Sequence, residues 1–276
     1  KEADLMKNKF FIPCVLFMAV SLLGGCAKNN TDKSYKEDNL PELNIGIDGV
    51  YEPYTYTDEN GDLTGIDIEL AKEACERIGR KAVFIPIKWD NKDEYLKNGE
   101  VDCIWSCFTY TGREKKYLWA GPYMNSRQIV VVRKSSDINE LDDLNGKTIA
   151  VMSSTKPEEL LLEGDNDKFP KAGRLYSVEN MDIVFAMLRN DYVDAAACHG
   201  VVAAEYINEF PELYKILDES LLDAKVGVAF EKDGDKELAD ELTKALEEMR
   251  NDGTSKEILQ KYGIDADKAL EVKEFE

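Results

Sequence analysis

Histidine is almost absent from this sequence, since His199 is the only one among 276 residues. A zinc site built from three imidazoles is therefore excluded. Positive charge is also scarce: 35 lysines and arginines stand against 55 aspartates and glutamates, which gives a formal net charge of −20. Phosphate backbones repel so acidic a body, and we expect no nucleic-acid partner. The GxxxxGKS or GxxxxGKT pattern that binds nucleotide phosphates is missing too, and we expect no cofactor.

A long hydrophobic run lies near the N-terminus. Two lysines precede the apolar residues 10–23, and small residues lead up to Cys26. A positive start, an apolar centre and a small-residue end are typical of a secretory signal, whereas a buried core helix does not need the basic start. We therefore interpret residues 1–25 as a signal peptide. Residues 26–39 are polar, with almost no apolar content, and are expected to form a flexible tether.

Four further cysteines follow, namely Cys75, Cys103, Cys107 and Cys198. Export permits disulfide bonds, but this spacing is not that of a dense disulfide framework. Cys103 and Cys107 are close enough in sequence to suggest metal ligation, yet no second pair has zinc-ribbon spacing. The pattern favours buried or free thiols and no metal, and it leaves open whether any of the four pair.

Beyond the tether, apolar runs alternate with helical patterns in two series of similar order. In each series a helix ends in a polar turn and leads into a strand that begins with Val-Asp, at residues 96–102 and 188–194. This order predicts an α/β fold of two similar lobes with mostly parallel sheets flanked by helices. Thr155 is expected to begin a helix as its N-cap, with Glu158 as the capping-box partner. The expected strands are 43–47, 82–87, 101–105, 147–152, 174–177 and 193–197, and further helices are expected at 68–78, 91–98, 181–188, 238–249 and 254–262.

Short motifs occur in a specific order between residues 43 and 263. They lie at 47–48, 51–54, 61–70, 101–102, 109–113, 119–123, 144–147, 153–155, 193–195 and 252–254. Each motif alone is weak, but together they resemble the type II extracellular solute-binding proteins of ABC importers, in family 3, the polar amino acid group. The resemblance implies the two-lobed fold of periplasmic binding proteins, with the ligand held between the lobes by hinge closure.

In this family the chain crosses between the lobes twice. The resemblance places these crossings near 128–132 and 225–229, in two apolar segments rich in β-formers. It therefore implies that residues 40–130 plus 226–276 form lobe 1 and that residues 131–225 form lobe 2.

The end of the signal also resembles the lipobox of bacterial lipoproteins. This resemblance implies that Cys26 becomes the first mature residue and carries acyl chains such as palmitate, which anchor the protein to the membrane. We expect a monomer at the extracellular face of the cell membrane, or in the periplasm where the source has an outer membrane. The implied partners are a small polar solute, of amino-acid type, and an ABC permease.

The matching positions imply how a bound amino acid would be held. Arg113 would clamp the ligand carboxylate with two parallel charge-assisted hydrogen bonds. Ser154 and Thr155, at the expected helix start, would add backbone N–H groups for the same anion. Ser106 and Thr109 match positions that supply carbonyl and hydroxyl acceptors to the ammonium.

Tyr51 and Trp89 match the positions whose aromatic faces sandwich the ligand side chain, which suits an apolar or cationic group. Asp48 would add negative charge at the mouth of the cleft, or merely close a turn. His199 departs from the family pattern, because the family usually has an acidic residue at this position that binds the ligand ammonium. A neutral imidazole accepts one hydrogen bond but supplies no counter-charge. Either Asp48 compensates, or the ligand is not an ordinary α-amino acid.

The leading hypothesis is therefore a lipid-anchored receptor that captures a small solute and presents it to a transporter. An enzyme on the same scaffold, similar to the dehydratases that resemble these receptors, is the alternative. Such an enzyme needs a matched acid–base pair in the cleft. His199 with Asp48 is conceivable as that pair, but no motif supports it, so we expect a binding protein and not an enzyme.

Overall fold

The computed structural model describes residues 39–163 and 169–271. Contacts divide the chain into two units, Lys1–Asn39 and Leu40–Glu276. The expected signal peptide, Cys26 and nearly all of the expected tether lie outside the described residues. Within the described ranges, no helix is long and apolar enough to cross a membrane.

The first strand group consists of β4 (Lys81–Pro86), β1 (Glu42–Ile47) and β5 (Cys103–Ile104), all mutually parallel. Apolar side chains of β1 are fully buried, and helix α2 (Ile66–Arg77) packs its apolar stripe beside β4. The 3-10 turn η1 (Trp89–Asn91) and helix α3 (Lys92–Lys97) follow β4. A small hairpin of β2 (Tyr56–Thr57) and β3 (Leu63–Thr64) precedes α2.

The second strand group consists of β8 (Arg174–Val178), β7 (Thr148–Met152) and β9 (Ala195–His199), again parallel. The 3-10 turn η2 (Leu141–Leu144) leads into β7. The helices packed against this group are α4 (Lys156–Leu162), α5 (Met181–Arg189) and α6 (Gly200–Glu209).

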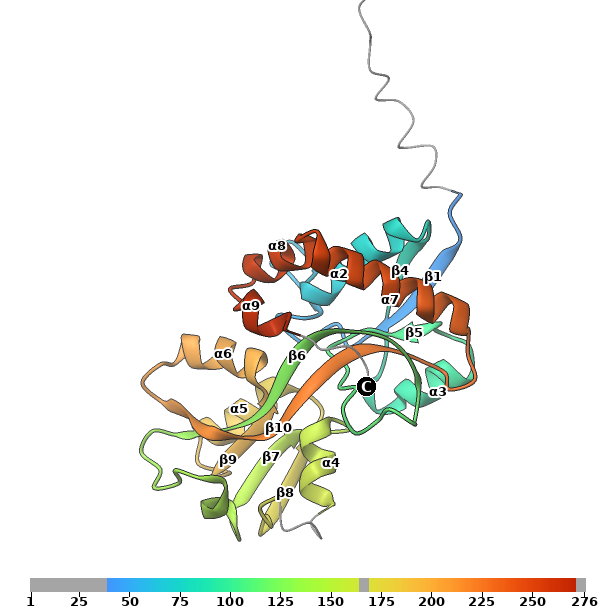
Figure 1. Ribbon diagram of the computed structural model, residues 1–276. Coiled ribbons are helices and arrows are strands. Elements are labelled where there is room, and N and C mark those ends of the chain that lie inside the picture. The colour runs from blue at the N-terminus through green and yellow to red at the C-terminus, as the bar shows by residue number, and fades with distance from the viewer. Residues whose placement is uncertain (1–38, 164–168, 272–276) are drawn as a thin grey trace, which may run out of the picture. The chain divides into compact units, whose positions relative to one another are not determined.

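Two long antiparallel strands, β6 (Leu118–Arg133) and β10 (Tyr214–Phe230), join the groups (Figure 1). The strand order is β4-β1-β5-β10-β6-β9-β7-β8, so the two expected sheets are continuous as one mixed sheet of eight strands. Strand β10 pairs with β5 through Ala229 and Phe230, whereas β6 pairs with β9 over 128–132. Residues 128–132, where the first crossing was expected, are therefore already hydrogen-bonded to the second strand group.

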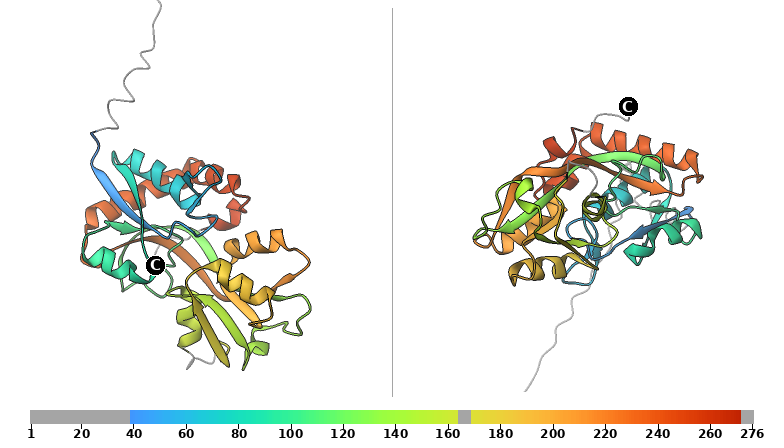
Figure 2. Two further views of the ribbon diagram at one scale, coloured as in Figure 1. Left: turned by 180° about the vertical axis from the view of Figure 1, so that it is seen from behind. Right: turned by 90° about the horizontal axis from the view of Figure 1, so that it is seen from below.

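The chain returns to the first strand group at its end, through α7 (Lys236–Asn251), α8 (Thr254–Lys261) and α9 (Ala266–Ala269). Helix α7 buries one apolar stripe and packs against α2, β6 and α8. Figure 2 shows these C-terminal helices from two further sides, on the same group as α2. The first group is therefore built from two separate parts of the chain.

The expected α/β fold is confirmed, and the expected strands and helices are present, but β5 and β9 begin at Cys103 and Ala195, after the Val-Asp pairs that were expected to open them. Helix α6 and the full lengths of β6 and β10 were not predicted. Cys75, Cys103, Cys107 and Cys198 are all buried free thiols. The capping-box prediction is wrong: Thr155 is the N-cap of α4, but its hydroxyl donates to the carbonyl of Met152 at 2.5 Å, and Glu158 accepts from the N–H of Ser154 at 2.6 Å.

Candidate functional site

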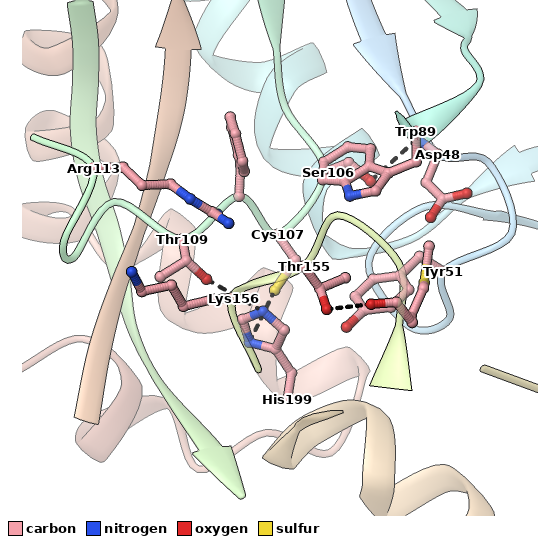
Figure 3. A pocket seen from close by; sticks show the side chains of 12 residues that line it. Asp48, Tyr51, Trp89, Ser106, Cys107, Thr109, Arg113, Thr155, Lys156 and His199 are labelled. Carbon is pink, nitrogen blue, oxygen red and sulfur yellow. Dashed lines mark hydrogen bonds between the residues drawn. The ribbon is translucent and has the colours of Figure 1, made fainter. Parts of the chain in front are cut away.

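A small cavity lies where the carboxyl ends of strands from both groups meet (Figure 3). This edge is where open α/β sheets bind ligands, because loops from several strands converge there. All the predicted ligand residues except Ser154 line the cavity. The lining residues are Asp48, Tyr51, Trp89, Ser106, Cys107, Phe108, Thr109, Arg113, Met152, Thr155, Lys156 and His199.

Arg113 reaches the cavity from the loop between β5 and β6. Its backbone N–H donates to the carbonyl of Tyr110 at 2.8 Å, which closes a tight turn. Its guanidinium lies over the ring of Phe108, with 5.1 Å from Cζ to the ring centroid, and only 9% of the side chain is exposed. The aromatic face and the turn fix the direction in which the guanidinium points.

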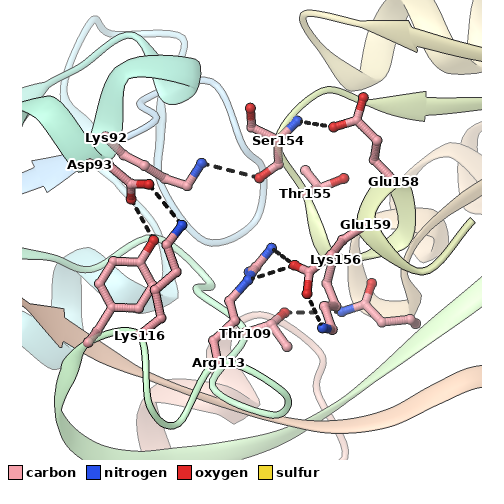
Figure 4. A network of polar contacts seen from close by, with 12 residues as sticks. Lys92, Asp93, Thr109, Arg113, Lys116, Ser154, Thr155, Lys156, Glu158 and Glu159 are labelled. Carbon is pink, nitrogen blue, oxygen red and sulfur yellow. Dashed lines mark hydrogen bonds and ion pairs between the residues drawn. The ribbon is translucent and has the colours of Figure 1, made fainter. Parts of the chain in front are cut away.

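Helix α4 of the second group supplies a carboxylate and an ammonium beside Arg113 (Figure 4). The Glu159 carboxylate pairs with Arg113 at 2.8 Å through one oxygen and with the Lys156 ammonium at 2.6 Å through the other. Burial raises the pKa of Glu159, but the hydrogen bond from Lys156 and the charge of Arg113 outweigh it, so the pKa lies below its usual value. Sequence reasoning missed both residues, because an i, i+3 lysine–glutamate pair in a first helical turn is an ordinary surface pattern.

Ser154 lies apart from the cavity, in the neighbouring groove that Lys92 and Glu158 also line. Its N–H is occupied by Glu158, and its carbonyl accepts from Nζ of Lys92 at 3.2 Å. Ser153 donates to the carboxylate of Asp90 at 2.9 Å in the same region. These contacts, together with the pair of Arg113 with Glu159, connect the first strand group to the second beside the cavity.

His199 ends β9 and is 4% exposed. Its Nδ1 lies 2.7 Å from Oγ of Ser126, Nε2 of Gln128 lies 3.1 Å from its Nε2, and Oγ1 of Thr109 lies 3.5 Å from the same atom. The Cys107 thiol is 3.5 Å from Nδ1. Burial, and secondarily the charge of Arg113, lowers the pKa of His199 to about 3, so the imidazole is neutral.

Asp48 follows directly after β1 and faces the cavity from the side opposite Arg113 (Figure 3). Its backbone N–H donates to Oγ of Ser106 at 3.3 Å. Among the described residues, none forms a hydrogen bond or an ion pair with its carboxylate. Burial raises the pKa of Asp48 to about 6. A partly desolvated carboxylate without a protein partner is suited to bind a cation of a ligand.

Two aromatic side chains complete this end of the cavity. Tyr51 is fixed by a turn in which its N–H donates to the carbonyl of Thr55 at 2.7 Å, and its ring lies edge-on to His199 at 6.2 Å. Trp89, in η1, lies edge-on to Phe108 at 5.5 Å. The cavity therefore has a pole of Arg113 and Lys156, a pole of Asp48, and aromatic rings on its wall.

Comparison with known proteins gives one consistent answer. The model of the bacterial extracellular solute-binding proteins, family 3, matches residues 43–265. The chain is 31% identical over 272 residues to the L-cystine-binding protein TcyA of Bacillus subtilis (strain 168), which covers 92% of this chain and 97% of that protein. It is 31% identical over 229 residues to the histidine-binding periplasmic protein of Escherichia coli (strain K12), covering 80% and 86%.

Solved structures agree with the sequence relatives. The structure of Tv2483 bound to L-arginine superposes with a TM-score of 0.76 at 27% identity, and the match covers 84% of this chain and 95% of that chain. The proteins matched here are binding proteins, and the two-lobed α/β fold is shared. The chain belongs to the bacterial extracellular solute-binding proteins of family 3.

Proposed function

We propose that this protein binds an amino acid or a related small carboxylate in the cavity and delivers it to an ABC permease. One observation carries this proposal: the Arg113 guanidinium and the Asp48 carboxylate face one cavity from opposite sides. The guanidinium suits a ligand carboxylate, because its planar fork donates two parallel hydrogen bonds. Nε and one terminal amino group of Arg113 donate to the Glu159 carboxylate. The other terminal amino group of Arg113 is therefore available to the ligand.

The opposite pole supports a ligand with a positive group at its far end. Asp48 offers a carboxylate that no described side chain neutralises, and the rings of Tyr51 and Trp89 line the path toward it. Aromatic faces attract cations, and the attraction grows when the cation is desolvated. Within the proposed class, side chains such as those of arginine, lysine and histidine fit best.

Closure of two lobes would convert binding into a signal for the permease. We assign 40–130 plus 226–276 to lobe 1 and 131–225 to lobe 2, joined through β6 and β10. The ion pair of Arg113 with Glu159 and the hydrogen bond of Lys92 with Ser154 then cross between lobes and stabilise the closed form. Hinge closure around a ligand is a common way to report occupancy. We propose that the protein acts as a monomer.

A thermal-shift screen tests the assignment of the ligand. We expect L-arginine, L-lysine or L-histidine, at about 100 times its dissociation constant, to raise the unfolding midpoint by about 5 to 10 °C, because only the native state binds it. L-Glutamate, whose side chain would meet Asp48, should give no shift. L-Cystine, glycine and L-leucine complete the panel. If L-glutamate raises the midpoint most, the proposed orientation is wrong.

We also propose that Cys26 carries the lipid anchor at the outer face of the membrane, on the strength of the signal-like residues before it. In cells that express the full chain, radiolabelled palmitate should label the protein and the protein should sediment with membranes. The Cys26→Ser variant should lose the label and the sedimentation, while Cys75→Ser, which alters a buried thiol, keeps both. Labelling of the Cys26→Ser variant would contradict the anchor.

A further inference from the structure

The pole around Arg113 carries an excess of positive charge. Arg113 and Lys156 are almost fully buried, with side chains 9% and 5% exposed. They share the single carboxylate of Glu159, one through each oxygen. Two cations against one anion leave a net charge of +1 beside the cavity, where water screens it poorly. A ligand carboxylate is the natural complement of this charge.

Among the described residues that line the cavity at this pole, none carries a negative charge for a ligand ammonium. The ring of His199 is neutral, and its polar neighbours Ser126, Gln128 and Thr109 are neutral as well. The Thr109 hydroxyl accepts from Gln128 at 3.3 Å. The Ser106 hydroxyl lies 2.8 Å from the hydroxyl of Thr55 and accepts from the Asp48 N–H. Such hydroxyls offer a further lone pair but no counter-charge.

An α-amino acid carries its ammonium on the carbon next to the carboxylate. If Arg113 grips that carboxylate, the ammonium must sit within the same positive region, beside Lys156 and the neutral His199. Like charges at such short range in a desolvated site repel each other strongly. The one lining carboxylate without a described partner, that of Asp48, lies across the cavity (Figure 3).

We propose that the site selects small carboxylates that have no α-ammonium and whose positive group lies at the far end, toward Asp48. This inference rests on the proposed function and names its substrate class: ω-amino and ω-guanidino carboxylates. In these compounds the two charges are separated by a short methylene chain. The carboxylate then meets the pole of Arg113 and Lys156 without an adjacent cation. The chain passes Tyr51 and Trp89, and the distal cation pairs with Asp48.

Calorimetric titration at pH 7.5 with matched pairs tests this class. One pair is L-arginine and 5-guanidinopentanoate, and the other is L-lysine and 6-aminohexanoate. The members of each pair differ only in the α-ammonium. We expect the compound without it to bind about tenfold more tightly in both pairs. If either α-amino acid binds more tightly than its partner compound, or equally tightly, the inference is overturned while the proposed function stands.

Two variants at His199 test whether the missing carboxylate at this position causes the preference for ligands without an α-ammonium. His199→Asp adds a carboxylate at the deficient position and should reverse the preference, so that L-arginine binds more tightly than 5-guanidinopentanoate. His199→Asn is neutral and similar in size, and should keep the wild-type preference. The ratio of the two affinities is the readout, since misfolding lowers both together. If none of the four compounds and no amino acid of the screen binds, the proposed function itself fails.

Discussion

Replacement of Arg113 by alanine should weaken binding of the tightest ligand by about 100-fold or more. The guanidinium is buried and rests on Phe108, and in the proposed complex it supplies charge-assisted hydrogen bonds to the ligand carboxylate. Loss of one partner from such a desolvated pair costs about 2–5 kcal/mol, largely because the remaining charge is left unpaired. Lys156 and Glu159 would then neutralise each other, which removes the net positive charge from this pole. Isothermal titration calorimetry at pH 7.5 measures the change.

Arg127 provides a matched control for this experiment. It lies on β6, about half of its side chain is exposed, and it pairs with Asp223 at 3.4 Å. Exposed ion pairs of this kind contribute little, so Arg127→Ala should bind the ligand as the wild type does. Unfolding midpoints without ligand show whether each variant is folded. An affinity of Arg113→Ala within threefold of the wild type would remove Arg113 from the binding site.

Much of the site could be predicted because its residues follow strands. Asp48 comes directly after β1, Ser106 after β5, and His199 closes β9. Each strand has a clear apolar signal, and parallel strands bring their carboxyl ends to the same edge. Once the strands are placed, the order of the chain therefore brings these side chains together. The resemblance to the family added which of the loop residues line the cavity.

Lys156 and Glu159 could not be found in this way. In the sequence they belong to a helix start with an ordinary charged pattern. Their role depends on the approach of Arg113 from a loop more than forty residues away in sequence, which only the tertiary structure supplies. Local pattern therefore placed Thr155 at the start of the helix but did not reveal that this helix neutralises the buried guanidinium.

The full lengths of β6 and β10 were missed for a different reason. Strand β6 contains Gly121 and Pro122 near its start and polar residues at 125–128, which interrupt the apolar alternation. Those polar residues belong where the strand leaves one group for the other, and the buried Ser126 and Gln128 bond there to His199. A strand that packs first in one strand group and then in the other buries different faces along its length. The alternation of apolar and polar residues that identifies a strand in a sequence is therefore not kept.

Acid should weaken the binding of any ligand whose positive group pairs with Asp48. Burial raises the pKa of this carboxyl to about 6, and only its ionised form attracts the cation. Below pH 6 the ionised fraction falls about tenfold for each pH unit, so the affinity at pH 5 should be about tenfold lower than at pH 7. Toward pH 7 the affinity should level off as the Asp48 carboxyl becomes ionised. Titration calorimetry with 6-aminohexanoate or L-arginine between pH 4.5 and 8 measures this profile.

Two other buried groups affect the interpretation of this profile. His199 has a pKa of about 3 and stays neutral throughout the range. Asp67, whose carboxylate accepts from the N–H of Cys107, has its pKa raised by burial to about 7. A raised carboxyl pKa stabilises the fold at low pH, and this contribution is lost as pH rises through 7. Asp67 therefore does not cause unfolding at pH 5, and a loss of affinity there reports on the cavity.

The Asp48→Asn variant assigns the titration to one side chain. It keeps the shape of the carboxyl group and removes its charge, so its affinity at pH 7 should fall by about tenfold or more and show no slope between pH 5 and 7. Hexanoate, which lacks the amino group of 6-aminohexanoate, should bind wild-type protein without the acid-dependent loss, because it presents no cation to Asp48. A wild-type profile that is flat for the amino compound, or a slope that persists in Asp48→Asn, would show that the cation lies elsewhere. The two-pole arrangement would then reduce to the carboxylate clamp alone.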